Sequence, residues 1–129
     1  MERVSENKIK ILFVDDDPLM LTILKNRYEN KGYRIYTASS GDEALEIFEK
    51  ERPSLVISDY VMRGMDGDEL CAKMKSLDSN VKILILTGQK LDNFIIKAMK
   101  SGADDYMTKP FSPVELDFKI EKLLKSQDD

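Results

Sequence analysis

The sequence contains no histidine and only one cysteine among its 129 residues. Without histidine the chain lacks the commonest general base and the usual zinc ligand, and it cannot carry a phosphohistidine. The lone Cys71 cannot form an internal disulfide, which is typical of a reducing compartment. It lies beside the apolar stripe of Leu70, Met74 and Leu77, so we interpret it as a packed core residue. Any chemistry of this chain must therefore use carboxylates, hydroxyls and lysine.

The chain also lacks long hydrophobic runs and an excess of positive charge. Its apolar runs, such as 11–14 and 83–86, are far shorter than the roughly 20 residues that span a bilayer. The N-terminal MERVSENK has no hydrophobic signal-peptide core. A total of 20 Lys and Arg against 24 Asp and Glu gives a net charge of −4, without the basic surface that non-specific nucleic-acid binding requires. We therefore expect a cytoplasmic protein that binds neither membranes nor nucleic acid directly.

The composition that remains is that of a globular domain, with 42% apolar and 34% charged residues. We expect a single domain over residues 1–129, with its core at about 8–125 and polar tails at both ends. Five apolar or β-branched runs alternate with helical periodicity, which predicts βα units, a parallel sheet and the α/β class. Right-handed crossovers place helices on both faces, and the flavodoxin-like strand order 2-1-3-4-5 is the common solution. The predicted strands are Ile9–Val14, Arg34–Ala38, Leu55–Ser58, Val81–Leu86 and Asp105–Thr108.

Five helices are predicted to follow these strands. The first begins with Asp17 as N-cap and Pro18 at its first position, and it ends before Lys31. The remaining four start at Ser40, after the turn at 65–67, at about Leu91 (ending near Lys100) and after Ser112-Pro113.

Polar side chains follow four of the five predicted strands. Asp15 and Asp16 follow the first strand and Asp59 follows the third, while Thr87 and Lys109 follow the fourth and fifth. Ligands of open α/β sheets bind beyond the carboxyl ends of the strands, near the reversal of strand order. We therefore expect these five side chains to converge at one edge of the sheet.

Three converging carboxylates repel one another unless a cation lies among them. Oxygen ligands without His or Cys favour Mg²⁺, which also prefers phosphate oxygens. Thr87 can donate a hydrogen bond to a phosphoryl oxygen and Lys109 can neutralise another. Asp59, alone at its strand end, is the best-placed nucleophile for an acyl phosphate.

Each of these residues also has an ordinary structural interpretation. An aspartate after a strand is usually a turn or cap residue, Thr87 before Gly88 suits a turn, and Lys109 suits a solvated surface. Only their joint placement at one sheet edge favours a functional site.

Four motifs together carry a family resemblance. They are FVDDDP at 13–18, VISDYVMRGMDG at 56–67, LTG at 86–88 and DYMTKPF at 105–111. In order and spacing they resemble the receiver domain of two-component response regulators, as in chemotaxis-type single-domain regulators, over roughly Lys8 to Lys125.

The resemblance implies a role for each site residue. It makes Asp59 the phosphoacceptor and Lys109 the lysine that contacts the phosphoryl group, with a cis peptide between Lys109 and Pro110. It makes Thr87 and Tyr106 the pair that switches conformation. The implied Mg²⁺ ligands are Asp15, Asp16, Asp59 and the backbone carbonyl of Val61.

One position departs from the family pattern. Most members carry proline after the methionine of the loop that follows the acceptor, where this sequence has Met62-Arg63. We expect a looser loop and an added cation near the phosphate site. The departure should alter the rate of phosphorylation or dephosphorylation, or partner docking, without abolishing acceptance.

The implied function is that of a signalling phosphoacceptor that catalyses its own phosphorylation and dephosphorylation and is not an enzyme in the ordinary sense. The donor would be a histidine kinase or a histidine phosphotransfer protein. The output would be a downstream protein or a second copy, bound through the fourth helix, fifth strand and fifth helix. Phe94–Ile96 cannot all face one core, and Val114 and Phe118 lie opposite the inward stripe of the last helix. Scattered surface apolar residues are the alternative explanation.

Two other function classes stay open. A Mg²⁺-dependent phosphatase of the haloacid dehalogenase type also uses an aspartyl nucleophile, but it needs an acid/base carboxylate two residues later, where this chain has Val61. A degenerate receiver that only binds partners is the other class, and the full set of site residues speaks against it.

Overall fold

The computed structural model describes residues 8–88 and 99–126. Its five strands form one parallel sheet in the order β2-β1-β3-β4-β5, which confirms the predicted topology. The observed strands differ from the predicted ones by at most one residue at either end. They are β1 (Lys10–Val14), β2 (Arg34–Ala38), β3 (Leu55–Asp59), β4 (Lys82–Thr87) and β5 (Asp105–Thr108).

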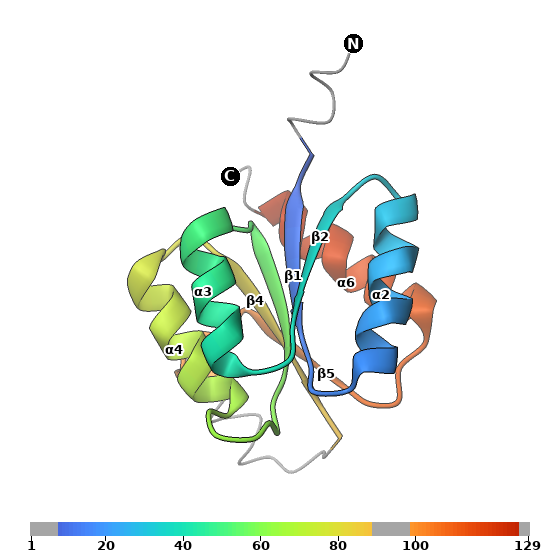
Figure 1. The fold of residues 1–129 in the computed structure, drawn as a ribbon. Coiled ribbons are helices and arrows are strands. Elements are labelled where there is room, and N and C mark those ends of the chain that lie inside the picture. Colours follow the sequence, from blue (N-terminus) through green and yellow to red (C-terminus); the bar gives the residue numbers. More distant parts are fainter. Residues whose placement is uncertain (1–7, 89–98, 127–129) are drawn as a thin grey trace.

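Helices cover both faces of this sheet (Figure 1). α3 and α4 lie on one face, and α2 and α6 lie on the other. The described residues contain four helices, and the helix predicted at about 91–100 lies mostly outside them. The four are α2 (Pro18–Asn30), α3 (Gly41–Glu51), α4 (Gly67–Leu77) and α6 (Pro113–Lys125).

Side-chain caps start all four helices. The carboxylate of Asp17 accepts hydrogen bonds from the backbone N–H groups of Leu19 and Met20, and Pro18 occupies the first helical position, as predicted. Such a cap satisfies backbone donors that have no partner within the helix. The side chains of Ser40, Asp66 and Ser112 cap the other three helices in the same way.

The core has two layers because each central strand is buried on both faces. Leu12 and Val14 of β1 face the layer of α3 and α4, whereas Ile11 and Phe13 face the layer of α2 and α6. This double burial produces the continuous apolar runs that central parallel strands show. Among the described residues, no helix has the length and apolar character needed to cross a membrane.

Two side chains of α4 test the predicted core. Cys71 is 1% exposed, which confirms it as a packed residue. Leu77 was expected to point inward, but it is 41% exposed. It is the last residue of α4, where the helix ends and leaves the layer that Leu70 and Met74 fill.

Candidate functional site

Three carboxylates meet where β1 and β3 end, at the lower edge of the sheet in Figure 1. β1 and β3 are neighbours in the sheet, and Val14 pairs with Ser58, so Asp15 just after β1 lies beside Asp59, the last residue of β3. Asp15, Asp16 and Asp59 each offer one oxygen within 4.8 Å of the others. Asp15 is buried, Asp59 is partly buried and Asp16 is exposed, so the cluster opens to solvent at Asp16. The predicted convergence of these three residues is confirmed.

Lys109 reaches the same cluster from the edge strand. Its Nζ lies 3.1 Å from Oδ2 of Asp15 and 3.1 Å from Oδ1 of Asp59. The Lys109 N–H donates to the carbonyl oxygen of Thr87 at 2.8 Å, and the Lys109–Pro110 peptide is cis, as the resemblance implied. Because β4 separates β5 from β3, the Lys109 side chain extends past the end of β4 to reach Asp59.

The charges of the cluster do not balance. Burial is the main cause that raises the pKa of the Asp59 carboxyl, and the charges of Asp15 and Asp16 raise it further against the opposing effect of Lys109. Burial by itself would lower the pKa of Lys109, but the hydrogen bonds and charges of Asp59 and Asp15 outweigh it and raise that pKa. One ammonium therefore serves more than one carboxylate.

The donor set fits a hard divalent cation. Three carboxylates supply oxygen ligands alone, and the surplus of negative charge is what a cation would relieve. Asp17 does not join them, because its carboxylate caps α2. Its backbone N–H instead donates to Oδ1 of Asp15 at 3.0 Å, which fixes that carboxylate.

Ser58 and Gly67 lie against the backbone carbonyl of Asp59, and Gly41 lies against the loop that follows it; sequence reasoning missed all three contacts. The buried Ser58 hydroxyl donates to the carbonyl oxygen of Asp59 at 2.9 Å. A Cβ at Gly67 would lie 2.8 Å from that same oxygen, so only glycine allows this approach. A Cβ at Gly41 would lie 2.9 Å from the Met65 side chain, which packs across the start of α3. The MDG motif and the Ser-Gly helix start were visible in the sequence, but their mutual contact was not.

The loop after Asp59 has a buried and an exposed part. Met62 is 8% exposed and belongs to the layer of α3 and α4. The side chain of Val61 is 63% exposed, and Arg63 is exposed next to Gly64, which has φ of +80°. Met62 therefore anchors the loop while Val61 and Arg63 face solvent.

The two predicted switch residues lie on adjacent strands. Thr87 ends β4 and is 4% exposed, whereas Tyr106 of β5 is 36% exposed. Tyr106 pairs with Ile85, and Thr108 pairs with Thr87. Thr87 thus lies at the same strand ends as the carboxylates, and Tyr106 lies in the outermost strand of the sheet.

Comparison with known proteins shows the family of the chain. The profile of the response regulator receiver domain matches residues 11–121. This range contains the whole candidate site and all five strands, except for Lys10 at the start of β1. The chain belongs to the response regulator receiver domain family. Receiver domains of two-component response regulators are signalling phosphoacceptors.

Two relatives and one solved structure illustrate the match. The chain is 39% identical over 116 residues to the alkaline phosphatase synthesis transcriptional regulatory protein PhoP of Bacillus subtilis, covering 90% of this chain and 48% of that one. It is 43% identical over 127 residues to the probable transcriptional regulator ycf27 of Porphyra purpurea, covering 97% of this chain and 51% of the relative. A CheY-like receiver domain protein from Methanospirillum hungatei superposes with a TM-score of 0.91 at 32% identity, covering 95% and 98% of the two chains. The chain spans about half the length of the curated relatives it matches.

Proposed function

We propose that Asp59 is the residue that accepts the phosphoryl group, from the phosphohistidine of a histidine kinase or phosphotransfer protein. A carboxylate oxygen of Asp59 attacks phosphorus, the bond from phosphorus to the imidazole nitrogen breaks, and an acyl phosphate forms. The observation that carries the proposal is the position of Lys109 Nζ, 3.1 Å from both Asp59 and Asp15. An ammonium there neutralises a phosphoryl oxygen held by Asp59.

A magnesium ion is part of this proposal. Asp15, Asp16 and Asp59 would hold it, together with the backbone carbonyl of Val61. Bound there, Mg²⁺ supplies positive charge to the phosphoryl oxygens. The hydroxyl of Thr87 would donate a hydrogen bond to one of these oxygens, and Lys109 would contact another.

Phosphorylation would then change the surface formed by β5 and α6. The acyl phosphate adds close to two negative charges, which would draw Thr87 inward and free space for Tyr106 to turn. Val114 and Phe118 of α6 are 72% and 66% exposed, as predicted, while Leu116 and Ile120 are buried. Phe94–Ile96 lie outside the described residues. We infer that this surface binds a downstream protein or a second copy, and that hydrolysis of the acyl phosphate resets it.

We also propose that the protein is located in the cytoplasm. A reducing cytoplasm suits the free, buried thiol of Cys71. The receiver unit would extend over about residues 8–125 and would not bind nucleic acid directly.

Intact mass spectrometry tests the assignment of Asp59. We expect the chain to gain one phosphoryl mass when it is incubated with a small acyl-phosphate donor and Mg²⁺. Asp59→Asn should gain none, whereas Asp42→Asn, the same chemical change on the exposed first turn of α3, should behave as the wild type.

The two other function classes give different results in this experiment. No mass gain by the wild type would indicate a degenerate receiver. Steady turnover of unrelated phosphomonoesters that depends on Asp59 would indicate a phosphatase. Either result would contradict the proposal.

A further inference from the structure

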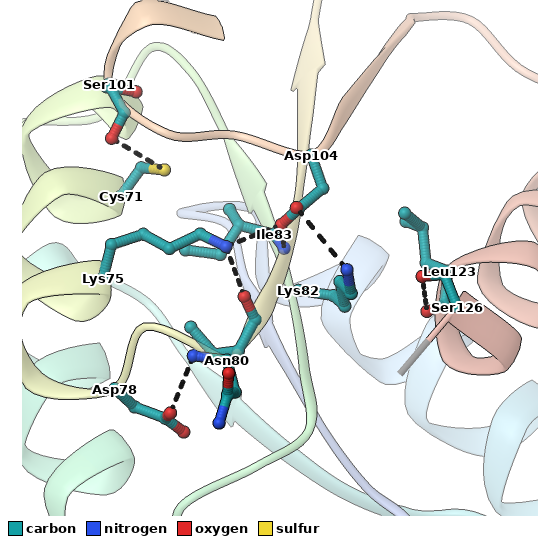
Figure 2. Close-up of polar contacts among 11 residues, drawn as sticks. Cys71, Lys75, Asp78, Asn80, Lys82, Ile83, Ser101, Asp104, Leu123 and Ser126 are labelled. Carbon is teal, nitrogen blue, oxygen red and sulfur yellow. Dashed lines mark hydrogen bonds and ion pairs between the residues drawn. The ribbon is translucent and has the colours of Figure 1, made fainter. Parts of the chain in front are cut away.

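A polar cluster around Lys75 and Asp104 lies at the amino-terminal end of β5 (Figure 2). The carboxylates of the candidate site lie at the opposite, carboxyl ends of the strands. Nζ of Lys75, from α4, donates to the carbonyl oxygen of Val81 at 2.5 Å and to Oδ2 of Asp104 at 2.9 Å. The same Oδ2 accepts from the backbone N–H of Ile83 at 2.8 Å, and the Asp104 N–H donates to the Ile83 carbonyl oxygen at 2.8 Å. Asp104 therefore binds β4 through its backbone and its side chain, and binds α4 through Lys75.

The aliphatic part of Lys75 contacts the same turn. Gly102 has φ of +107°, and a Cβ there would lie 3.2 Å from Cγ of Lys75. One helical turn earlier, Sγ of Cys71 donates to the carbonyl oxygen of Ser101 at 3.6 Å. α4 thus contacts residues 101, 102 and 104, directly before β5 begins.

β5 needs such contacts because it is a short strand at the edge of the sheet. It has four residues and, within the described part of the chain, pairs only with β4, so few hydrogen bonds fix its register. A slip by one residue would turn Tyr106 to the opposite face and displace Lys109 along the sheet. The Asp104–Ile83 bonds exclude that slip.

Asp105, the residue after Asp104, is bound from the opposite face of the sheet. Nζ of Lys119, from α6, lies 2.8 Å from Oδ2 of Asp105. Successive side chains of an extended chain point to opposite faces, so Asp104 meets α4 and Asp105 meets α6. The start of β5 is therefore fixed by one lysine from each helical layer.

We propose that Lys75 is a positioning residue that sets the register of β5 through Asp104 and thereby places Lys109 against Asp59. The effect on phosphorylation rests on the proposed function of Asp59. The partners of the Lys75 ammonium are Val81 and Asp104, at the other end of the strands from Asp15, Asp16 and Asp59. Its contribution is to keep the strand that carries Lys109 aligned with β4.

Hydrogen exchange tests the register without phosphate or metal. The Lys109 amide donates to the Thr87 carbonyl, so its exchange reports whether β5 stays paired at its far end. In Lys75→Met we expect this amide to exchange about tenfold faster, while the Asp15 amide, which bonds to Ala38 in another part of the sheet, stays as in the wild type. Asp104→Asn keeps an oxygen for the Ile83 amide but loses the charge, and it should give the same result if Lys75→Met fails to fold.

Two further variants serve as controls. Lys75→Arg keeps the cation and should restore wild-type exchange. Lys82→Met removes a lysine of similar exposure that lies 3.9 Å from the other oxygen of Asp104, and it should leave the Lys109 amide unchanged.

Phosphorylation by a small acyl-phosphate donor completes the test. We expect Lys75→Met and Asp104→Asn to slow the gain of one phosphoryl mass about threefold at unchanged Mg²⁺ dependence, because the metal ligands do not lie on β5. Unchanged exchange at Lys109, or an equal increase at Lys109 and Asp15, would overturn the proposal. Faster exchange at Lys109 with a wild-type phosphorylation rate would contradict the proposal that Lys75 places Lys109 for phosphorylation, and would show that Lys75 only stabilises the pairing of β5. If the wild type gains no phosphoryl mass at all, the proposed function fails and the exchange result alone decides the register.

Discussion

Two clusters of aspartate and cation in this chain have opposite electrostatics. At the sheet edge, Asp59 shares Lys109 with Asp15, and burial raises the pKa of its carboxyl. Between α2 and α6, hydrogen bonds from Arg27 lower the pKa of the Asp117 carboxyl to about 2. The same residue types thus produce a site with surplus negative charge in one place and a satisfied ion pair in the other.

The difference comes from the number of donors around each carboxylate. Asp117 accepts from Nε and Nη2 of Arg27 at 3.0 and 2.5 Å and from the Tyr28 hydroxyl at 2.6 Å, and Nζ of Lys31 lies 3.7 Å away. Burial is the main cause that raises the pKa of the Tyr28 phenol, and its bond to Asp117 raises it further. A carboxylate surrounded by donors stabilises the fold, whereas one crowded by other carboxylates is available for a cation and for phosphate.

Removing the shared cation at the sheet edge should have the largest effect. We expect Lys109→Met to slow phosphorylation by a small acyl-phosphate donor roughly 100-fold, because no ammonium then neutralises the phosphoryl oxygens. Lys10→Met removes a lysine paired with Glu51 at 3.3 Å and should leave the rate unchanged. A rate for Lys109→Met within twofold of the wild type would contradict the role of this residue.

Breaking the other cluster should affect stability and not phosphorylation. We expect Asp117→Asn to lower the free energy of unfolding by about 2 kcal/mol, since a charged hydrogen-bond acceptor is lost beside the buried Tyr28. Urea denaturation measures this change, and Glu121→Gln, on the exposed side of α6, is the matched control. A phosphorylation rate that fell with the stability would show that the clusters are not independent.

The same change from aspartate to asparagine at position 59 should raise the free energy of unfolding instead of lowering it. Asp59→Asn removes a carboxylate that burial and like charges disfavour, so we expect the free energy of unfolding to rise by about 0.5–1 kcal/mol. Denaturation in the absence of Mg²⁺ gives the value. A loss of stability as large as that of Asp117→Asn would mean that Lys109 compensates Asp59 fully.

The sequence predicted the sheet-edge site better than the helix cluster. Asp15, Asp59 and Lys109 each follow a predicted strand, and parallel strands bring their carboxyl ends to one edge, so topology alone predicted their convergence. Arg27 and Asp117 are 90 residues apart on two helix surfaces, and no periodicity indicates which surface residues of two helices meet. Tyr28 continues Leu21 and Leu24 at helical spacing, which indicates burial but no hydrogen-bond partner.

The contacts at the start of β5 escaped prediction for the same reason. Lys75 and Asp104 lie 29 residues apart in the sequence. Each residue taken alone is of a type that is normally found on the solvated surface. Leu77 was assigned to the core because it continues the stripe of Leu70 and Met74, although helix periodicity cannot show where a helix leaves the sheet. Sequence patterns thus located the strand-end chemistry, whereas side-chain contacts between elements required the structure.

The smallest expected effect is a difference in the pH dependence of stability between the two clusters. It is also the most specific, because it depends on the pKa of each aspartate. The Asp117 carboxyl has a lowered pKa, so its contribution is fully present above the unfolded pKa of about 4 and is lost as the pH falls toward about 2. The Asp59 carboxyl has a raised pKa, so the cost of its charge is present above the folded pKa and disappears as the pH falls to about 4. In urea denaturation from pH 7 to pH 2, the stability difference between wild type and Asp59→Asn should therefore disappear by about pH 4, whereas the difference between wild type and Asp117→Asn should shrink mainly below pH 4. If both differences vanished over the same pH range, the two carboxylates would share one environment and the contrast between the clusters would be wrong.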